Sequence, residues 1–124
     1  MKPKIKTALI SVSDKTDLSK ILKTLKKFNV KIISSGGTYK SIKQLGYTCT
    51  EVSVYTGFKE MLDGRIKTLH PKIHAGILHD RSNKSHSKEM NKQKFPSLDL
   101  IIVNFYPFQK IVTDSKNKKK IIEN

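Results

Sequence analysis

The sequence has a single cysteine and no long apolar run, and each shortage excludes a class of protein. One cysteine, Cys49, cannot form an internal disulfide, which favours the reducing cytoplasm. Apolar residues make up 36% of the 124 positions but fall in short runs, whereas a membrane-spanning helix needs about 18 in succession. The opening segment MKPKIKTALISVSDK also lacks the apolar core and cleavage site of a signal peptide. We therefore expect one cytoplasmic domain that does not enter a membrane.

Acidic residues are scarce as well, since 10 Asp and Glu stand against 25 Lys and Arg and give a net charge of +15. A basic surface can bind nucleic acid by releasing counterions from phosphates. However, only Arg65 and Arg81 are arginine, which leaves 25 − 2 = 23 lysines, and readout of bases favours the bidentate arginine fork. The strongest basic run, residues 116–120, lies near a terminus, where charge runs are commonly solvated. We interpret the lysines as a solvated surface and expect no nucleic-acid partner.

Short apolar runs alternate with helix-like segments along the chain. Strands are expected at residues 8–13, 30–34 and 49–55, and the most convincing buried strand is expected in LDLIIVNFYPF, residues 98–108. Helices are expected at residues 14–28, 38–46 and 57–64 and in parts of 80–97. This alternation predicts an α/β fold in which helices cover both faces of a parallel sheet, making three layers.

The first two predicted helices have clear inner faces. Spacings of three and four residues place one set on the same side of the first helix: Leu18, Ile21, Leu22, Leu25 and Phe28. In the second helix we expect Ile42 and Leu45 to point inward and Gly46 to end the helix.

Polar loops follow three predicted strands, and the carboxyl ends of parallel strands share one edge of a sheet. SVSDKT, residues 11–16, brings hydroxyls and Lys15 to that edge, and NFYP follows the last strand. In SGGT, residues 35–38, the glycines let backbone N–H groups approach an anion at the positive end of a helix. A glycine pair can also merely join a strand to a helix, but together the loops predict a phosphate site. Neither a Walker loop nor a dinucleotide fingerprint is present, so we expect no ATP or NAD site.

The segment DGRIKTLHPKIHAGIL, residues 63–78, concentrates reactive side chains. Arg65 suits a site that needs a flat bidentate donor, and Lys67 could transfer a proton or stabilise developing negative charge. Three histidines, at 70, 74 and 79, invite a zinc site. Pro71 disfavours a helix running through the first two, so we expect no metal.

In this order and spacing, SVSDKT, SGGT, YTGFKEMLDGRIKTLHPKIHAGIL and NFYPF resemble the N-terminal domain of bifunctional purine-biosynthesis enzymes. Those enzymes join phosphoribosylaminoimidazolecarboxamide formyltransferase to IMP cyclohydrolase, and the resemblance covers residues 7–110. It implies a methylglyoxal-synthase-like fold, a homodimer, and no metal or other cofactor. The implied substrate is a purine-precursor ribonucleotide, the formamido-carboxamide ribonucleotide, whose ring closes with loss of water to give IMP.

The resemblance also implies the site residues. The nucleotide-binding set is Ser13, Asp14, Lys15, Ser35, Gly36, Gly37, Thr38, Arg65, Ile66, Thr68, Val103 and Asn104. Lys67 and Tyr106 match catalytic residues: Lys67 would stabilise the oxygen that becomes negative, and Tyr106 would assist proton movement.

Family members carry two further cyclohydrolase motifs, ID-x-GG and RAAAKN, which this sequence lacks after KIIEN. We therefore expect residues 1–124 to form a cyclohydrolase domain that is incomplete at its C-terminus, has no formyltransferase domain, and has weak or no activity by itself. The alternative is a methylglyoxal-synthase-like module that binds a phosphate ligand without catalysis.

Overall fold

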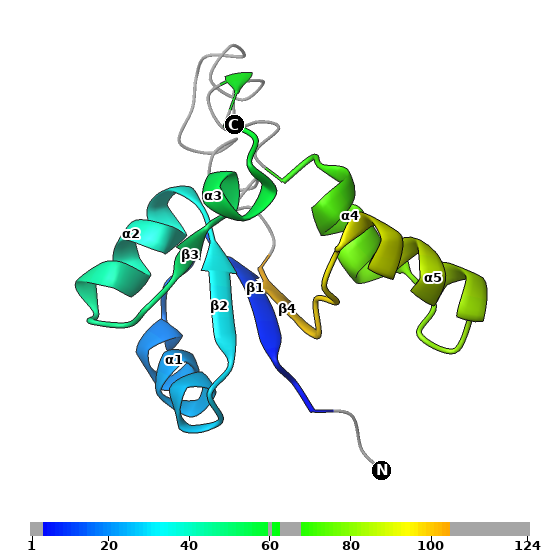
Figure 1. Cartoon of the computed structure of the whole chain (residues 1–124). Helices are drawn as coiled ribbons and strands as arrows, with labels where there is room; N and C mark the ends of the chain where they lie inside the picture. Colours follow the sequence, from blue (N-terminus) through cyan, green and yellow to red (C-terminus); the bar gives the residue numbers. More distant parts are fainter. Residues whose placement is uncertain (1–3, 60, 63–67, 105–124) are drawn as a thin grey trace.

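The computed structural model describes residues 4–59, 61–62 and 68–104 (Figure 1). The elements in chain order are β1 (Thr7–Ser11), α1 (Leu18–Lys27), β2 (Lys31–Ser34), α2 (Gly36–Gln44), β3 (Thr50–Glu51), α3 (Val52–Thr56), α4 (Pro71–Leu78), α5 (Lys84–Gln93) and β4 (Leu100–Val103).

The strands of the described part form one sheet in the order β3-β2-β1-β4, and every neighbouring pair is parallel. Leu9 in β1 lies opposite Ile33 in β2 on one side and Ile101 in β4 on the other. The chain thus moves outward from β1 through β2 to β3 and returns to the far side of β1 for β4. Such a reversal opens a crevice at the carboxyl ends of β1 and β4, where α/β sheets bind their ligands.

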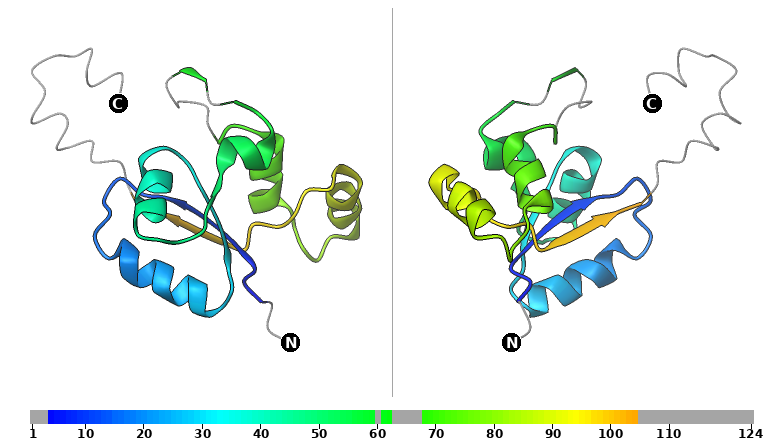
Figure 2. Two further views of the ribbon diagram at one scale, coloured as in Figure 1. Left: turned by 60° about the vertical axis from the view of Figure 1, so that its left-hand side comes forward. Right: turned by 90° about the vertical axis from the view of Figure 1, so that its right-hand side faces the viewer.

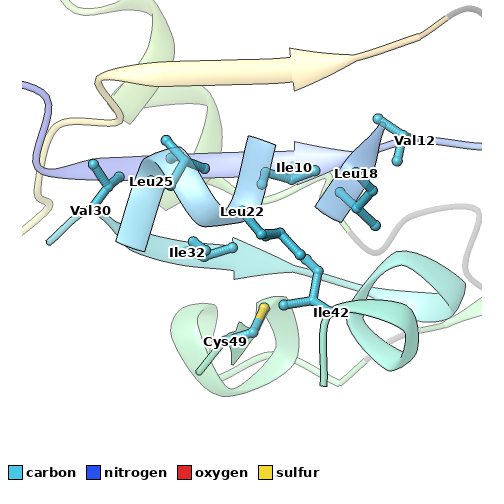
Figure 3. Packing of buried hydrophobic residues seen from close by; sticks show 10 residues of the cluster. Ile10, Val12, Leu18, Leu22, Leu25, Val30, Ile32, Ile42 and Cys49 are labelled. Carbon is cyan, nitrogen blue, oxygen red and sulfur yellow. The ribbon is translucent and has the colours of Figure 1, made fainter. Parts of the chain in front are cut away.

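Helices cover both faces of this sheet, because successive strand residues point to opposite sides. One face packs under α1 and α2 in a buried cluster made of Ala8, Ile10, Val12, Leu18, Leu22, Leu25, Val30, Ile32, Ile42 and Cys49 (Figure 3). The other face packs under α3 and α4 in a cluster made of Leu9, Ile33, Val52, Tyr55, Ile73 and Leu98. Helices α1 and α4, which each contribute to one of the clusters, lie on opposite sides of the sheet (Figure 2). The predicted three-layer parallel α/β fold is therefore confirmed.

The first two helices have their predicted inner faces except at their last residues. Leu18, Leu22 and Leu25 are buried in α1, but Phe28 is 66% exposed. Leu45 after α2 is 47% exposed. The inward predictions for Phe28 and Leu45 are wrong, and both residues are C-caps, one position beyond the last residue of a helix that packs on the sheet. The turn after α2 is completed by Gly46 at a φ of 89°, as predicted for a helix stop.

Three other sequence predictions need correction. Of the strand expected at residues 49–55, only Thr50–Glu51 is a strand, because Val52 and Tyr55 bury themselves at helical spacing in α3. Of the helix expected at 57–64, residues 57–59 and 61 are not helical, since Gly57 ends α3 in the left-handed region, whereas Leu62 lies in a 3₁₀ turn and the other residues lie outside the described ones. The buried strand expected within residues 98–108, β4, is an edge strand in the described sheet, and its Ile101 and Val103 are exposed.

The α4 helix was not predicted, and it contains a glycine whose lack of a side chain is essential to packing. An ideal Cβ at Gly76 would lie 2.9 Å from Leu98 Cγ and 3.2 Å from the Pro96 carbonyl oxygen. The Gly76 carbonyl also accepts a hydrogen bond from the Leu98 N–H, at 3.1 Å. This contact holds α4 against the segment that leads into β4.

Replacing Gly76 with alanine is therefore expected to destabilise the fold. Although alanine favours a helix, overpacking against Leu98 and the Pro96 backbone costs about 1–3 kcal/mol. Urea unfolding followed by circular dichroism measures the change. The control is Ser87→Ala in α5, and a Gly76→Ala protein as stable as this control would contradict the proposed close packing.

Candidate functional site

The crevice between β1 and β4 is closed by an amide side chain. Asn104 Oδ1 accepts hydrogen bonds from the Ser13 N–H and hydroxyl, both at 2.9 Å. Its Nδ2 donates to the Asp14 carbonyl oxygen, also at 2.9 Å. The predicted binding residues Ser13 and Asn104 thus lie together, and their contact fixes the loop after β1 relative to the end of β4.

A second contact fixes the start of α2 to the end of β1. The buried Thr38 hydroxyl accepts a hydrogen bond from the Val12 N–H at 3.1 Å and donates to the Val12 carbonyl oxygen at 2.9 Å. Because this hydroxyl is engaged within the protein, Thr38 can offer a ligand its backbone N–H in this conformation. The same carbonyl oxygen accepts a hydrogen bond from Lys15 Nζ at 3.0 Å.

The first turn of α2 has an extended serine followed by a glycine pair. Ser35 occupies the N-cap position in an extended conformation, and Gly36 follows with a φ of 57°, which glycine adopts readily. An N-cap serine ordinarily accepts a hydrogen bond from a backbone N–H of the first turn. The Ser35 hydroxyl makes no such bond; it is buried, at 4% exposure, and has no hydrogen-bond partner among the described residues. A hydroxyl and the first N–H groups of the helix are thus available to the same ligand.

A cation lies over this turn. An ideal Cβ at Gly37 would lie 3.8 Å from Lys15 Nζ, so the ammonium group stands directly above the glycine. The positive end of the α2 dipole and the Lys15 charge therefore act at the same place. Together with the Ser35 hydroxyl they form a cradle that suits a phosphate. We call the group of Lys15, Ser35, Gly36 and Gly37 the phosphate cradle.

Asp14 lies next to the cradle as an exposed carboxylate. Its Oδ1 accepts hydrogen bonds from the Thr16 hydroxyl at 2.6 Å and the Thr16 N–H at 2.9 Å. These bonds, with a smaller contribution from the Lys15 charge, lower the pKa of Asp14. Asp14 is therefore ionised near neutral pH and suits a hydroxyl or N–H donor of a ligand rather than its phosphate.

The remaining predicted site residues divide into two groups. Val103 is the last residue of β4, 61% exposed, and adjoins Asn104 at the carboxyl edge. Thr68 is half-buried, and its carbonyl oxygen accepts a hydrogen bond from the His70 N–H at 2.9 Å. Four predicted residues lie outside the described ones: Arg65, Ile66, Lys67 and Tyr106.

Two histidines of the segment 63–78, His70 and His74, make hydrogen-bonding contacts at the start of α4. Helix α4 begins at Pro71, with His70 as its N-cap, and His70 Nδ1 accepts a hydrogen bond from the Lys72 N–H at 3.0 Å. His74 Nδ1 lies 3.2 Å from the His70 carbonyl oxygen. Within residues 4–59, 61–62 and 68–104, no group of three or more His, Cys, Asp or Glu side chains is placed to hold a metal ion.

Sequence reasoning missed the pair Tyr55 and Lys72. Lys72 Nζ lies 4.2 Å from the centroid of the Tyr55 ring and donates to the Tyr55 carbonyl oxygen at 2.7 Å. Tyr55 is buried, and burial raises the pKa of its hydroxyl. This contact joins α4 to α3, but nothing in the sequence distinguishes Lys72 from the other lysines.

Comparisons with known proteins agree with this architecture. A family model described as "MGS-like domain" matches residues 17–124. A solved structure described as "Crystal structure of ForH" superposes with a TM-score of 0.74 at 28% sequence identity. The match covers 83% of this chain and 54% of that chain, so the present chain spans about half the length of ForH. No helix in the described part of the chain is long and apolar enough to cross a membrane.

Proposed function

Because this chain belongs to the family of MGS-like domains, we propose that its phosphate cradle binds the 5′-phosphate of a purine-precursor ribonucleotide. We further propose that the chain forms the N-terminal portion of an IMP cyclohydrolase. The proposal rests on the geometry of the cradle and, for the substrate, on the motif resemblance.

The proposal is carried by the buried Ser35 hydroxyl, which has no hydrogen-bond partner within the described part of the chain. A buried hydroxyl without a hydrogen bond lowers the stability of the fold by about 1–3 kcal/mol. Such a group in a folded protein calls for an explanation, and a ligand that supplies the missing hydrogen bond is one. Ser35 is the N-cap of α2, and Lys15 Nζ lies 3.8 Å from the place of a Cβ on Gly37, two residues further along. A phosphate would accept hydrogen bonds from the hydroxyl and the helix N–H groups and would be neutralised by Lys15.

Holding the phosphate also contributes to ring closure. In the formamido-carboxamide ribonucleotide, a weakly nucleophilic carboxamide nitrogen attacks the formyl carbon, and negative charge develops on oxygen. Fixing the nucleotide at its phosphate and sugar lowers the entropy cost of bringing the two substituents together. Lys67 would stabilise the developing oxyanion and Tyr106 would assist proton movement.

A non-catalytic phosphate-binding module is the second candidate. It is favoured by the chemistry of the described site, where hydrogen-bond donors and a cation suit phosphate binding. Conversion of the formamido substrate to IMP above the uncatalysed rate, followed by ultraviolet absorbance, would exclude the module, because a partial cyclohydrolase site can retain weak activity by holding the two substituents together. A module would bind IMP and give no conversion.

Ser35→Ala tests the cradle itself. Removing one hydrogen bond to a charged phosphate should weaken IMP binding about tenfold, measured by isothermal titration calorimetry. The free energy of unfolding should stay the same or rise, because the variant no longer buries an unpaired hydroxyl. Ser41→Ala, farther along α2, is the matched control and should leave IMP binding unchanged. A loss of stability without a loss of affinity would mean that Ser35 is structural and would refute the proposal.

A further inference from the structure

A serine and a histidine contact each other at the opposite edge of the sheet from the phosphate cradle. His79 directly follows α4, and Ser97 lies in the segment between α5 and β4. Figure 1 shows α4 and α5 next to each other on the β4 side of the sheet. The Ser97 hydroxyl oxygen is 3.0 Å from His79 Nε2, and both residues are half-buried.

The other ring nitrogen determines which atom of the pair donates. His79 Nδ1 lies 2.7 Å from the Ala75 carbonyl oxygen, which can only accept a hydrogen bond. Nδ1 must therefore carry the ring proton, and the neutral ring leaves Nε2 as an acceptor. The Ser97 hydroxyl consequently donates its proton to His79 Nε2. A hydroxyl that donates to an imidazole, itself oriented by a third group, is the arrangement that activates a serine nucleophile.

The pair lies between two surfaces of different character. Ser97 lines a cleft of about 400 Å³ together with Lys4, Lys6 and Arg81. The acid in that cleft, Asp99, already accepts from the N–H groups of Lys6 and Thr7 and from Arg81, so the two lysines dominate the remaining charge. On its other side, His79 lines an apolar groove of about 270 Å³ between α4 and α5.

We propose that Ser97 and His79 form a nucleophilic pair that accepts an acyl group from small activated esters carrying a negative charge. Ser97 Oγ forms a bond to the ester carbonyl carbon as its proton passes to His79 Nε2. The bond from that carbon to the leaving oxygen breaks, and the leaving group takes the electron pair and then the proton from His79. The products are an acyl-serine and an alcohol or phenol. The lysines attract the anionic group of the ester.

A purely structural role makes a different prediction. If the hydrogen bond only ties the end of α4 to the segment before β4, Ser97 should react no faster than other half-exposed serines. Ser82 is the internal comparison, because its hydroxyl lies in the preceding loop and donates to the Asp80 carboxylate at 2.7 Å rather than to an imidazole.

The test treats the 124-residue chain with mono-4-nitrophenyl succinate and maps the acyl group by tandem mass spectrometry. We expect acylation at Ser97 and not at Ser82. His79→Gln should slow the Ser97 reaction about a hundredfold, the scale of general-base catalysis, and Ser82→Ala should leave it unchanged. Circular dichroism checks that each variant is folded.

A charge test uses the same reaction. Replacing both Lys4 and Lys6 by glutamate should slow the acylation of Ser97 by the succinyl ester about tenfold. The rate of acylation by the uncharged 4-nitrophenyl acetate should not change. Equal acylation of Ser97 and Ser82 in the unaltered protein would overturn the proposal without any variant. An unchanged Ser97 rate in folded His79→Gln would also overturn it.

Discussion

Replacing Gly37 with alanine is expected to weaken IMP binding about tenfold to a hundredfold and, at the same time, to stabilise the fold. The new Cβ would lie 3.8 Å from Lys15 Nζ, an ordinary van der Waals contact that requires no shift of the protein. Alanine in a helix is about 0.5–1 kcal/mol more stable than glycine. The same methyl group occupies the space between the Lys15 ammonium group and the helix backbone, where the phosphate would lie. It should therefore remove hydrogen bonds to the phosphate that contribute about 1.5–3 kcal/mol to binding.

Two controls separate loss of the phosphate contact from a general disturbance. Gln44→Ala, in the last turn of α2, also improves helix propensity but lies far along the helix, so IMP affinity should not change. Inosine lacks the phosphate, and its binding should be much less sensitive to Gly37→Ala than that of IMP. Titration calorimetry of both ligands decides, and equal losses for IMP and inosine would contradict a phosphate role for the cradle.

The parallel sheet could be predicted because its strands read as consecutive apolar residues. Residues 8–10 and residues 32–33 are consecutive apolar positions in the sequence, a pattern typical of strands buried on both faces. The same pattern in β4 predicted a buried strand, but within the described sheet β4 lies at the edge and Val103 is exposed. A continuous apolar run therefore indicates a parallel strand and does not give its position in the sheet.

The α3 helix could not be predicted because its residues favour a strand. Val52, Val54 and Tyr55 have high β-propensity. In the structure, Val52 and Tyr55 are buried in one cluster with Leu9 and Ile33, whereas Val54 is 73% exposed. A helical turn places residues three apart, such as Val52 and Tyr55, on the same side. The sheet beneath them, which the local sequence does not reveal, therefore selects a helix over a strand. Tertiary packing here overrides local preference.

The location of the phosphate cradle was predictable, but its state of hydrogen bonding was not. Loops at strand ends predicted that SVSDKT and SGGT meet. Which hydroxyl remains unpaired depends on contacts between distant positions: Thr38 bonds to Val12, 26 residues away, while Ser35 finds no partner among the described residues. Two hydroxyl residues three positions apart thus differ: the Thr38 hydroxyl is bonded to the end of β1, and the Ser35 hydroxyl is not bonded within the described part of the chain.

Asp99→Ala is expected to cause the largest loss of stability among the described side chains we consider, about 2–4 kcal/mol. The Asp99 side chain is only 10% exposed, and it accepts hydrogen bonds from the Lys6 N–H at 2.8 Å and the Thr7 N–H at 3.0 Å. Arg81 donates to it at 2.9 Å. Removing the carboxylate leaves two backbone donors at the start of β1 without their acceptor and releases the loop that holds Arg81.

The matched control for Asp99 is an acid on the surface. Asp17 pairs with Lys20 at 3.5 Å, and the two side chains are 63% and 85% exposed. Exposed pairs of this kind contribute about 0–1 kcal/mol, and asparagine tolerates the φ of 63° at this position, so Asp17→Asn should hardly shift the urea midpoint. If Asp17→Asn and Asp99→Ala shift the midpoint equally, the buried carboxylate does not have the role assigned to it.

The pH dependence of unfolding gives an independent check on Asp99. Burial by itself raises the pKa of this carboxyl, but the hydrogen bonds from Lys6, Arg81 and Thr7 outweigh it and bring the pKa below the ordinary value of 3.8. A carboxyl with a lowered folded-state pKa stabilises the protein above its unfolded-state pKa, and this stabilisation disappears as the pH falls through the folded-state pKa. The free energy of unfolding should therefore decrease on acidification below about pH 4.

Asp99→Ala has no carboxyl to protonate at this position, so its free energy of unfolding should decrease less over the same interval. The difference in unfolding free energy between the unaltered protein and the variant should therefore become smaller. Parallel curves for the two proteins across this interval would show that Asp99 does not carry the acid sensitivity.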